Sequence, residues 1–173
     1  MEGWRFSRIS NRRYCLSPSC FLLLIDVMDD TIIPMRIVID TNIFVGACLG
    51  TGASGQVIAA CIQGRAIPIM STTLFLEYED VLSRASLFAH CRLDSAEREE
   101  LLDIFLARCE WVRVFYLWRP NLRDEGDNHL LELAVSGGAE GLVTRNYKDL
   151  SNPDLRFPQV RIFSPEHFLE EIK

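Results

Sequence analysis

The chain has 173 residues, of which 49% are apolar and 24% charged, a composition typical of one globular domain with a sizeable core. Its net charge of −6 and its isoelectric point near 5.1 argue against a sequence-specific DNA-binding protein, which usually has a basic surface. The same charge is compatible with a metal-dependent enzyme whose acidic site binds cations. The six cysteines form no close C-x-x-C pair and no zinc-ligand spacing with a histidine, so reduced thiols in a cytoplasmic protein are favoured over disulfides.

Residues 1–34 differ from the rest of the chain. Four arginines precede a short apolar run at 20–25. This segment resembles a secretory signal only faintly, because Asp26 interrupts the run and further acids follow it. No apolar segment is long enough to span a membrane. We predict a poorly ordered extension over 1–34, consistent with a start codon assigned too early, because Met35 stands directly before the first strand. The domain then covers residues 35–173.

Apolar patterns along the chain predict strands that alternate with helices. Strands are expected to end at Asp40 and to cover 66–70, 111–115, 141–144 and 160–163. Helices are expected after a turn at 51–55 with Ser54 as cap, over about 72–85 with Ser71 as cap, from the capping-box-like Asp94 to about residue 107, from near Asp127 to Gly137, and after Ser164. This alternation is typical of an α/β fold with a mostly parallel sheet.

Three carboxylates occupy positions where a surface acid would not be expected. Asp40 ends a wholly apolar strand, which is the mark of burial on both faces. Glu77 follows Leu74 by three residues on the apolar stripe of its helix, and Asp127 precedes Leu130 by three. Open α/β sheets bind their ligands at the carboxyl ends of the strands, so the three acids together predict a pocket there. Because clustered carboxylates repel each other, Mg²⁺ or Mn²⁺ would suit this pocket.

Each acid also has a simpler explanation. Asp40 could hydrogen-bond the turn that follows it. Glu77 could extend from the edge of its stripe or pair with Arg84. Asp127 could cap its helix.

Four blocks of sequence follow one another at characteristic separations: IVIDTNIFV from residue 37, LEYEDVL from 76, DNHLLELA from 127 and LVTRNYKDL from 142. Together they resemble the PIN-domain family, and most closely its branch of toxin components of toxin–antitoxin systems. Any one block is weakly specific, whereas four in order are strong, and the similarity covers about residues 36–172. The resemblance implies a three-layer α/β/α PIN-like fold over 35–173 and a Mg²⁺- or Mn²⁺-dependent ribonuclease.

Carried over residue by residue, the resemblance gives the three acids roles as metal ligands and catalytic residues: Asp40, Glu77 and Asp127. Asn42 and Thr144 match polar positions that shape the site.

The fourth acidic position of the family departs from its usual pattern in this chain. The family commonly has an aspartate two residues after the threonine matched by Thr144, and here that residue is Asn146. Asp149, three residues further on, could supply the fourth carboxylate, or Asn146 could act as a neutral oxygen ligand. Asp149 could equally be a turn residue.

Basic residues near these positions could hold the phosphates of RNA, or could simply belong to solvated loops: Arg123, Arg145 and Lys148. The resemblance further implies an RNA substrate, an antitoxin protein as partner and, as is common in the family, a homodimer. Two alternatives stay open. One is a degenerate domain that binds RNA or protein without catalysis because of Asn146. The other, disfavoured, is a haloacid-dehalogenase-type phosphatase, whose second aspartate would stand at Asn42.

Overall fold

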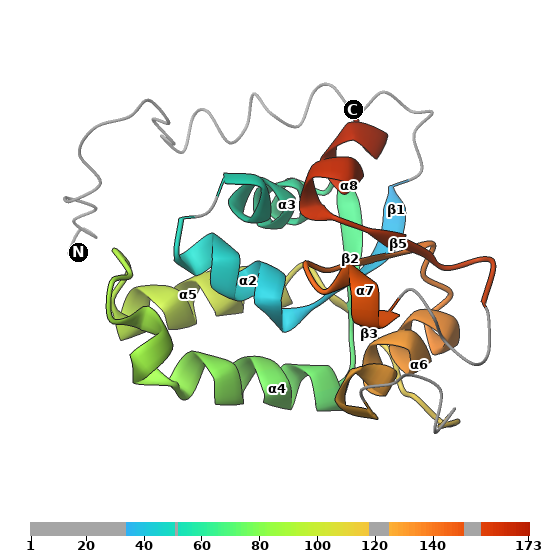
Figure 1. Ribbon diagram of the computed structural model, residues 1–173, viewed down its shortest axis with the longest axis horizontal. Helices are drawn as coiled ribbons and strands as arrows, with labels where there is room; N and C mark the ends of the chain where they lie inside the picture. Colours follow the sequence, from blue (N-terminus) through green and yellow to red (C-terminus); the bar gives the residue numbers. More distant parts are fainter. Residues whose placement is uncertain (1–33, 51, 118–124, 151–156) are drawn as a thin grey trace, which may run out of the picture. The chain divides into compact units, whose positions relative to one another are not determined.

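The computed structural model describes residues 34–50, 52–117, 125–150 and 157–173 (Figure 1). Residues Pro34–Lys173 form one compact unit. The extension expected over 1–34 lies outside the described residues, apart from Pro34.

Within the described residues, five parallel strands form the sheet in the order β3-β2-β1-β4-β5. Their bounds are β1 Met35–Ile39, β2 Ala66–Met70, β3 Glu110–Trp111, β4 Gly141–Val143 and β5 Arg161–Phe163. In the central strand, Ile37, Val38 and Ile39 are fully buried, as expected for a strand covered on both faces. The predicted α/β fold with a parallel sheet is confirmed.

Helices cover both faces of this sheet. They are α2 Thr41–Cys48, α3 Gly52–Ile62, α4 Thr72–Ser83, α5 Ser95–Leu106, α6 Asn128–Ser136, α7 Tyr147–Leu150 and α8 Pro165–Glu171, with 3-10 turns at η1 Ala85–Phe88 and η2 Glu125–Asp127. Phe163 of β5 packs against Phe168 of α8, and Ile69 of β2 lies beside the end of α6 at Gly137. Register places these two strand residues on opposite faces, so α8 and α6 belong to different layers and the fold is α/β/α.

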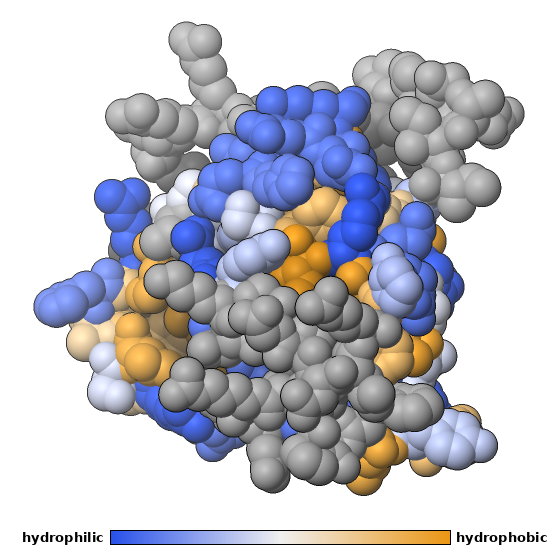
Figure 2. All heavy atoms as spheres, turned by 45° about the vertical axis from the view of Figure 1, so that its right-hand side comes forward, coloured by the Kyte–Doolittle hydropathy of each residue, from blue (hydrophilic) through white to orange (hydrophobic). Residues whose placement is uncertain are grey.

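Figure 2 shows hydrophilic residues gathered on the upper part of one face, at the height of α8, with hydrophobic residues exposed below them. Helix α8 contributes to the hydrophilic part, because Glu166, Glu170 and Glu171 are exposed on it while Phe168 is buried. No single described helix is long and apolar enough to cross a membrane, although α2 and α3 would together pass as a bent pair.

An aromatic cluster holds the helices at the carboxyl end of β1. The ring of Phe44 in α2 lies 5.3 Å from that of Tyr78 in α4 and 5.6 Å from that of Phe105 in α5. The Tyr78 hydroxyl donates to the carbonyl oxygen of Ile39 at 3.0 Å. Because Ile39 precedes Asp40 and Tyr78 follows Glu77, this bond brings the two acids to the same end of the sheet.

Local signals predicted the starts of three helices. Ser71, Asp94 and Ser164 cap α4, α5 and α8 with their side chains, and Asp94 forms a complete capping box with Glu97. One cap was wrong: α3 begins at Gly52, and Ser54 is buried inside it.

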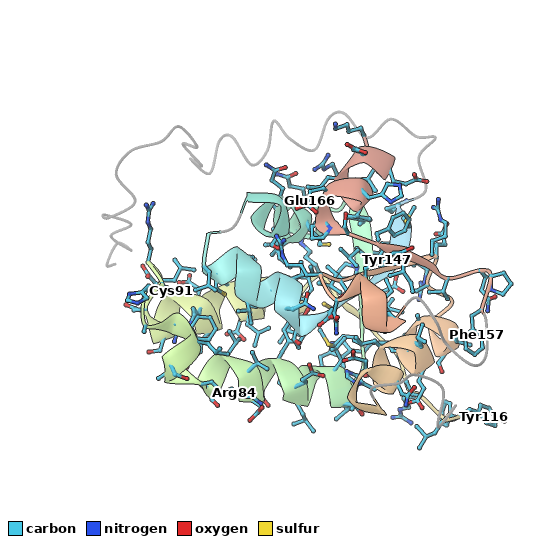
Figure 3. All side chains as sticks on the ribbon, viewed as in Figure 1. Arg84, Cys91, Tyr116, Tyr147, Phe157 and Glu166 are labelled. Atoms are coloured by element: carbon cyan, nitrogen blue, oxygen red, sulfur yellow. The ribbon has the colours of Figure 1, made fainter. Side chains whose placement is uncertain are left out.

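Helix α2 was missed, because a helix that is apolar on nearly every side has no polar face to reveal its period. The strand expected over 111–115 was too long. Partner strand β2 ends at Met70, which pairs with Trp111, so the following residues have no strand beside them. Phe115 is 78% exposed, and Tyr116 lies at the periphery of the domain (Figure 3).

The prediction of reduced thiols is confirmed for the described cysteines, since Cys48, Cys61, Cys91 and Cys109 are all free. Burial raises the pKa of the Cys48 thiol to about 11, which keeps it protonated at neutral pH.

Candidate active site

Asp40 stands at the junction of β1 and α2. Its N–H continues the sheet by donating to the Val143 carbonyl at 3.0 Å, and its side chain caps α2 by accepting from the N–H of Asn42 at 3.2 Å. The proposed hydrogen bond to the following turn therefore exists. The residue is only 7% exposed. Burial raises the pKa of its carboxyl group, and the Glu77 charge adds to this, against the lowering effect of hydrogen bonds from Thr144 and Asn42.

Thr144 and Asn42 hold one oxygen of this carboxylate. Asp40 Oδ2 accepts from the Thr144 hydroxyl and from Asn42 Nδ2, both at 2.6 Å. Thr144 also accepts from the Asn146 N–H at 2.8 Å. Thr144 directly follows β4, the strand beside β1, so its hydroxyl fixes the orientation of the Asp40 carboxylate from the neighbouring strand. The structure thus places both expected site-shaping residues in contact with the first acid.

Glu77 reaches the same edge from α4. Its Oε1 accepts from the Thr41 hydroxyl at 2.7 Å, and that hydroxyl lies 3.3 Å from Asp40 Oδ1. The suggested partner of Glu77 was wrong, because Arg84 pairs with Asp80 in the next turn of the helix.

Glu77 instead pairs with His129, a site residue that the sequence analysis missed. His129 Nε2 lies 2.8 Å from Glu77 Oε2, and Nδ1 lies 2.6 Å from the Gly126 carbonyl oxygen. A hydrogen bond from His129 lowers the pKa of Glu77 although burial opposes it. Burial acts to lower the pKa of His129, but Glu77, the Gly126 carbonyl and Asp127 outweigh it, so the pKa is raised. The only available sequence signal was a histidine two residues after Asp127 on an apolar helix.

Asp127 stands at the N-cap position of α6, but its side chain makes no capping hydrogen bond, so the interpretation as a helix cap was wrong. Asn146 Nδ2 lies 3.5 Å from Asp127 Oδ2. The unusual residue at the family's fourth acidic position therefore contacts the third acid directly.

The other predicted residues divide into two groups. Arg123 lies outside the described residues, and α7 includes Lys148 and Asp149, whose side chains are also outside the described part. Arg145 is bound within the protein: its guanidinium group donates to Ser54 Oγ at 2.9 and 3.1 Å and lies 3.9 Å from Glu166 at the start of α8.

The donor set suits a hard divalent cation. Asp40 and Glu77 are linked through Thr41. Burial is the main cause of the raised pKa of Asp40, and the nearby Glu77 charge adds to it, so a cation would offset both the burial and the repulsion. The described residues do not include three His, Cys, Asp or Glu side chains grouped as a formed metal site. Hydrogen bonds within the protein hold the acids at one edge of the sheet. The acids offer only oxygen atoms as possible metal ligands.

Comparison with known families shows to which family this chain belongs. A model of the PIN domain matches residues 36–148. The chain belongs to the PIN-domain family. The resemblance seen in the four sequence blocks is thereby confirmed, and PIN domains are generally nucleases.

Solved structures support the PIN fold. VapBC2 from Rickettsia felis, bound to a DNA fragment from its promoter, is similar with a TM-score of 0.51 and 20% identity, over 75% of this chain and 98% of that one. PAE2754 from Pyrobaculum aerophilum is similar with a TM-score of 0.54 and 16% identity, over 80% of this chain and 89% of that one. At these identities the likeness shows the fold alone. A comparison with curated proteins finds no match.

Proposed function

We propose that this PIN-domain protein is a divalent-metal-dependent endoribonuclease that hydrolyses RNA phosphodiester bonds. The observation that carries the proposal is the buried Asp40 at the carboxyl end of the central strand, joined through Thr41 to Glu77. Membership of a family of nucleases supports it.

Asp40, Glu77 and Asp127 would hold Mg²⁺ or Mn²⁺, with Asn146 or Asp149 as further candidates. When bound, such a cation makes a water molecule easier to deprotonate and offsets the charge on the phosphate oxygens. Asn42 and Thr144 keep the Asp40 carboxylate in one orientation. Arg123 and Lys148 remain proposed contacts for RNA phosphates, and such contacts would weaken with salt. Arg145 is the weaker candidate because Ser54 and Glu166 already hold its side chain.

The test uses the purified full chain, a labelled RNA and Mn²⁺. We expect cleavage by the wild type, none with a chelator, and none by Asp40→Asn. Asp103→Asn is a matched control, because Asp103 is an exposed acid on α5 outside the site, and it should cleave like the wild type. Equal cleavage by Asp40→Asn and wild type would overturn the proposal, as would the absence of Mn²⁺ binding in titration calorimetry.

The biological role that fits this activity is that of the toxin in a toxin–antitoxin system, in the cytoplasm and under the control of an antitoxin protein. Support comes from the resemblance of the four sequence blocks to the toxin branch of the family, and the fold is similar to that of VapBC2. Expression of the chain in bacteria should then arrest growth, and Asp40→Asn should not. A homodimer is also part of the proposal, and light scattering of the purified protein measures it directly.

The second candidate is a binding module for RNA or protein that has lost catalysis. It is favoured by one contact: Asn146, where the family commonly has an acid, lies 3.5 Å from Asp127. This candidate predicts RNA binding without cleavage by the wild type, and a gain of cleavage in Asn146→Asp.

A further inference from the structure

A continuous line of polar contacts joins Asp40 to the turn before α6. Thr41 bridges Asp40 and Glu77, Glu77 contacts His129, and His129 contacts the carbonyl of Gly126. The line therefore begins at the first acid of the site and ends one residue before the third, Asp127.

Glu77 is the member of this line that most needs support. Its side chain is 37% exposed, whereas that of Asp40 is buried, and a glutamate loses considerable rotamer freedom when it is fixed. Its two oxygens are nevertheless held separately, Oε1 by Thr41 and Oε2 by His129. Since each carboxylate oxygen has two lone pairs, both remain able to bind a cation.

His129 is suited to support and not to direct binding. The residue is 8% exposed, and both ring nitrogens lie within 2.8 Å of an oxygen atom, one from α4 and one from η2. Because each nitrogen faces a protein oxygen at close range, the ring is placed to hold Glu77 and not to ligate an ion itself.

We propose that His129 is a positioning residue of the cation site, which fixes the Glu77 carboxylate beside Asp40 and ties it to the turn that carries Asp127. The inference rests on the proposed function, because it assumes that these acids bind a divalent cation. Hydrogen-bond partners of ligating carboxylates commonly contribute about 10–100-fold to metal affinity. His129 thus sets the affinity of the site without touching the ion.

Titration calorimetry of the full chain with Mn²⁺ tests this inference. We expect His129→Ala to weaken Mn²⁺ binding by about 10–100-fold. His129→Gln should recover most of the loss, because its amide can still donate to Glu77. The matched control is His90→Ala, which removes an exposed histidine outside the helices that carry the site and should bind Mn²⁺ like the wild type.

A second comparison separates positioning from a general structural role. If His129 acts through Glu77, then adding His129→Gln or His129→Ala to Glu77→Gln should weaken binding by less than about twofold more, because the two residues act as one unit. A full further loss in the double variant would overturn the inference, and so would wild-type affinity in His129→Ala. Failure of the wild type to bind Mn²⁺ would instead overturn the proposed function, and this inference with it.

Discussion

Thr144→Val removes one hydroxyl group from the centre of the site while keeping nearly the same shape. Thr144 is fully buried, and its hydroxyl donates to the Asp40 carboxylate and accepts from the N–H of Asn146. It also lies 3.2 Å from Asn42 Nδ2. The substitution therefore tests whether these polar contacts stabilise the fold as well as orienting Asp40.

The magnitude follows from the bonds that are lost. A hydrogen bond to a charged group contributes about 1.5–3 kcal/mol, and a buried N–H left without an acceptor costs about 1–3 kcal/mol. Asn146 is half-buried, so its cost belongs at the low end. We expect a total loss of about 2–4 kcal/mol in the free energy of unfolding, a large part of the roughly 5–15 kcal/mol of a typical domain.

Urea denaturation of the metal-free protein, followed by circular dichroism, measures this loss. With a slope of about 2 kcal/mol per molar urea, the midpoint should fall by about 1–2 M. Thr144→Ser is the matched control, because it keeps the hydroxyl and removes only the methyl group. A larger loss in Thr144→Ser than in Thr144→Val would show that packing, and not hydrogen bonding, is the role of this side chain.

The pH dependence adds a second check. Thr144 lowers the pKa of Asp40 against the raising effect of burial, so its bond stabilises the ionised carboxylate. The difference in stability between wild type and Thr144→Val should therefore be fully present above the pKa of Asp40 in the variant, which is higher than in the wild type because the lowering effect of Thr144 is lost. It should shrink as pH falls through that value and Asp40 becomes protonated. A difference that does not change with pH would refute this reasoning.

Three further predictions concern other parts of the domain. Gly141→Ala should cost about 1–3 kcal/mol in thermal unfolding, because a Cβ there would lie 2.7 Å from the Phe163 ring; an unchanged midpoint would mean that the ring moves aside freely. Asp94→Ala should cost about 1 kcal/mol in urea unfolding through loss of the capping box, and no loss would show that α5 does not need its cap. The ion pair of Glu77 and His129 should stabilise the metal-free protein fully between pH 4.5 and 6.5, the ordinary pKa values of the two groups. Its contribution is lost as pH falls through the lowered pKa of Glu77 or rises through the raised pKa of His129, so a melting difference between wild type and His129→Gln that stays flat over pH would contradict it.

The parts of the fold that were predictable from sequence are those set by neighbouring residues. The apolar run before Asp40 predicted the central strand, and Ser71 and Asp94 predicted the starts of two helices. Both kinds of signal depend on only a few consecutive residues. Helix α2 and the length of β3 were not predictable in this way. The first has no polar face, and the second depends on where its partner strand ends.

The same distinction between local and tertiary effects applies to the candidate site. Sequence alone determined that Asp40 ends a buried strand and that Glu77 and Asp127 lie beside apolar helix positions, since these facts follow from local periodicity. Tertiary structure decided the partners: Glu77 pairs with His129 and not with Arg84, which directly follows its own helix. Contacts between α4 and α6 depend on how both helices pack at the end of the sheet, and no local pattern of residues encodes that packing.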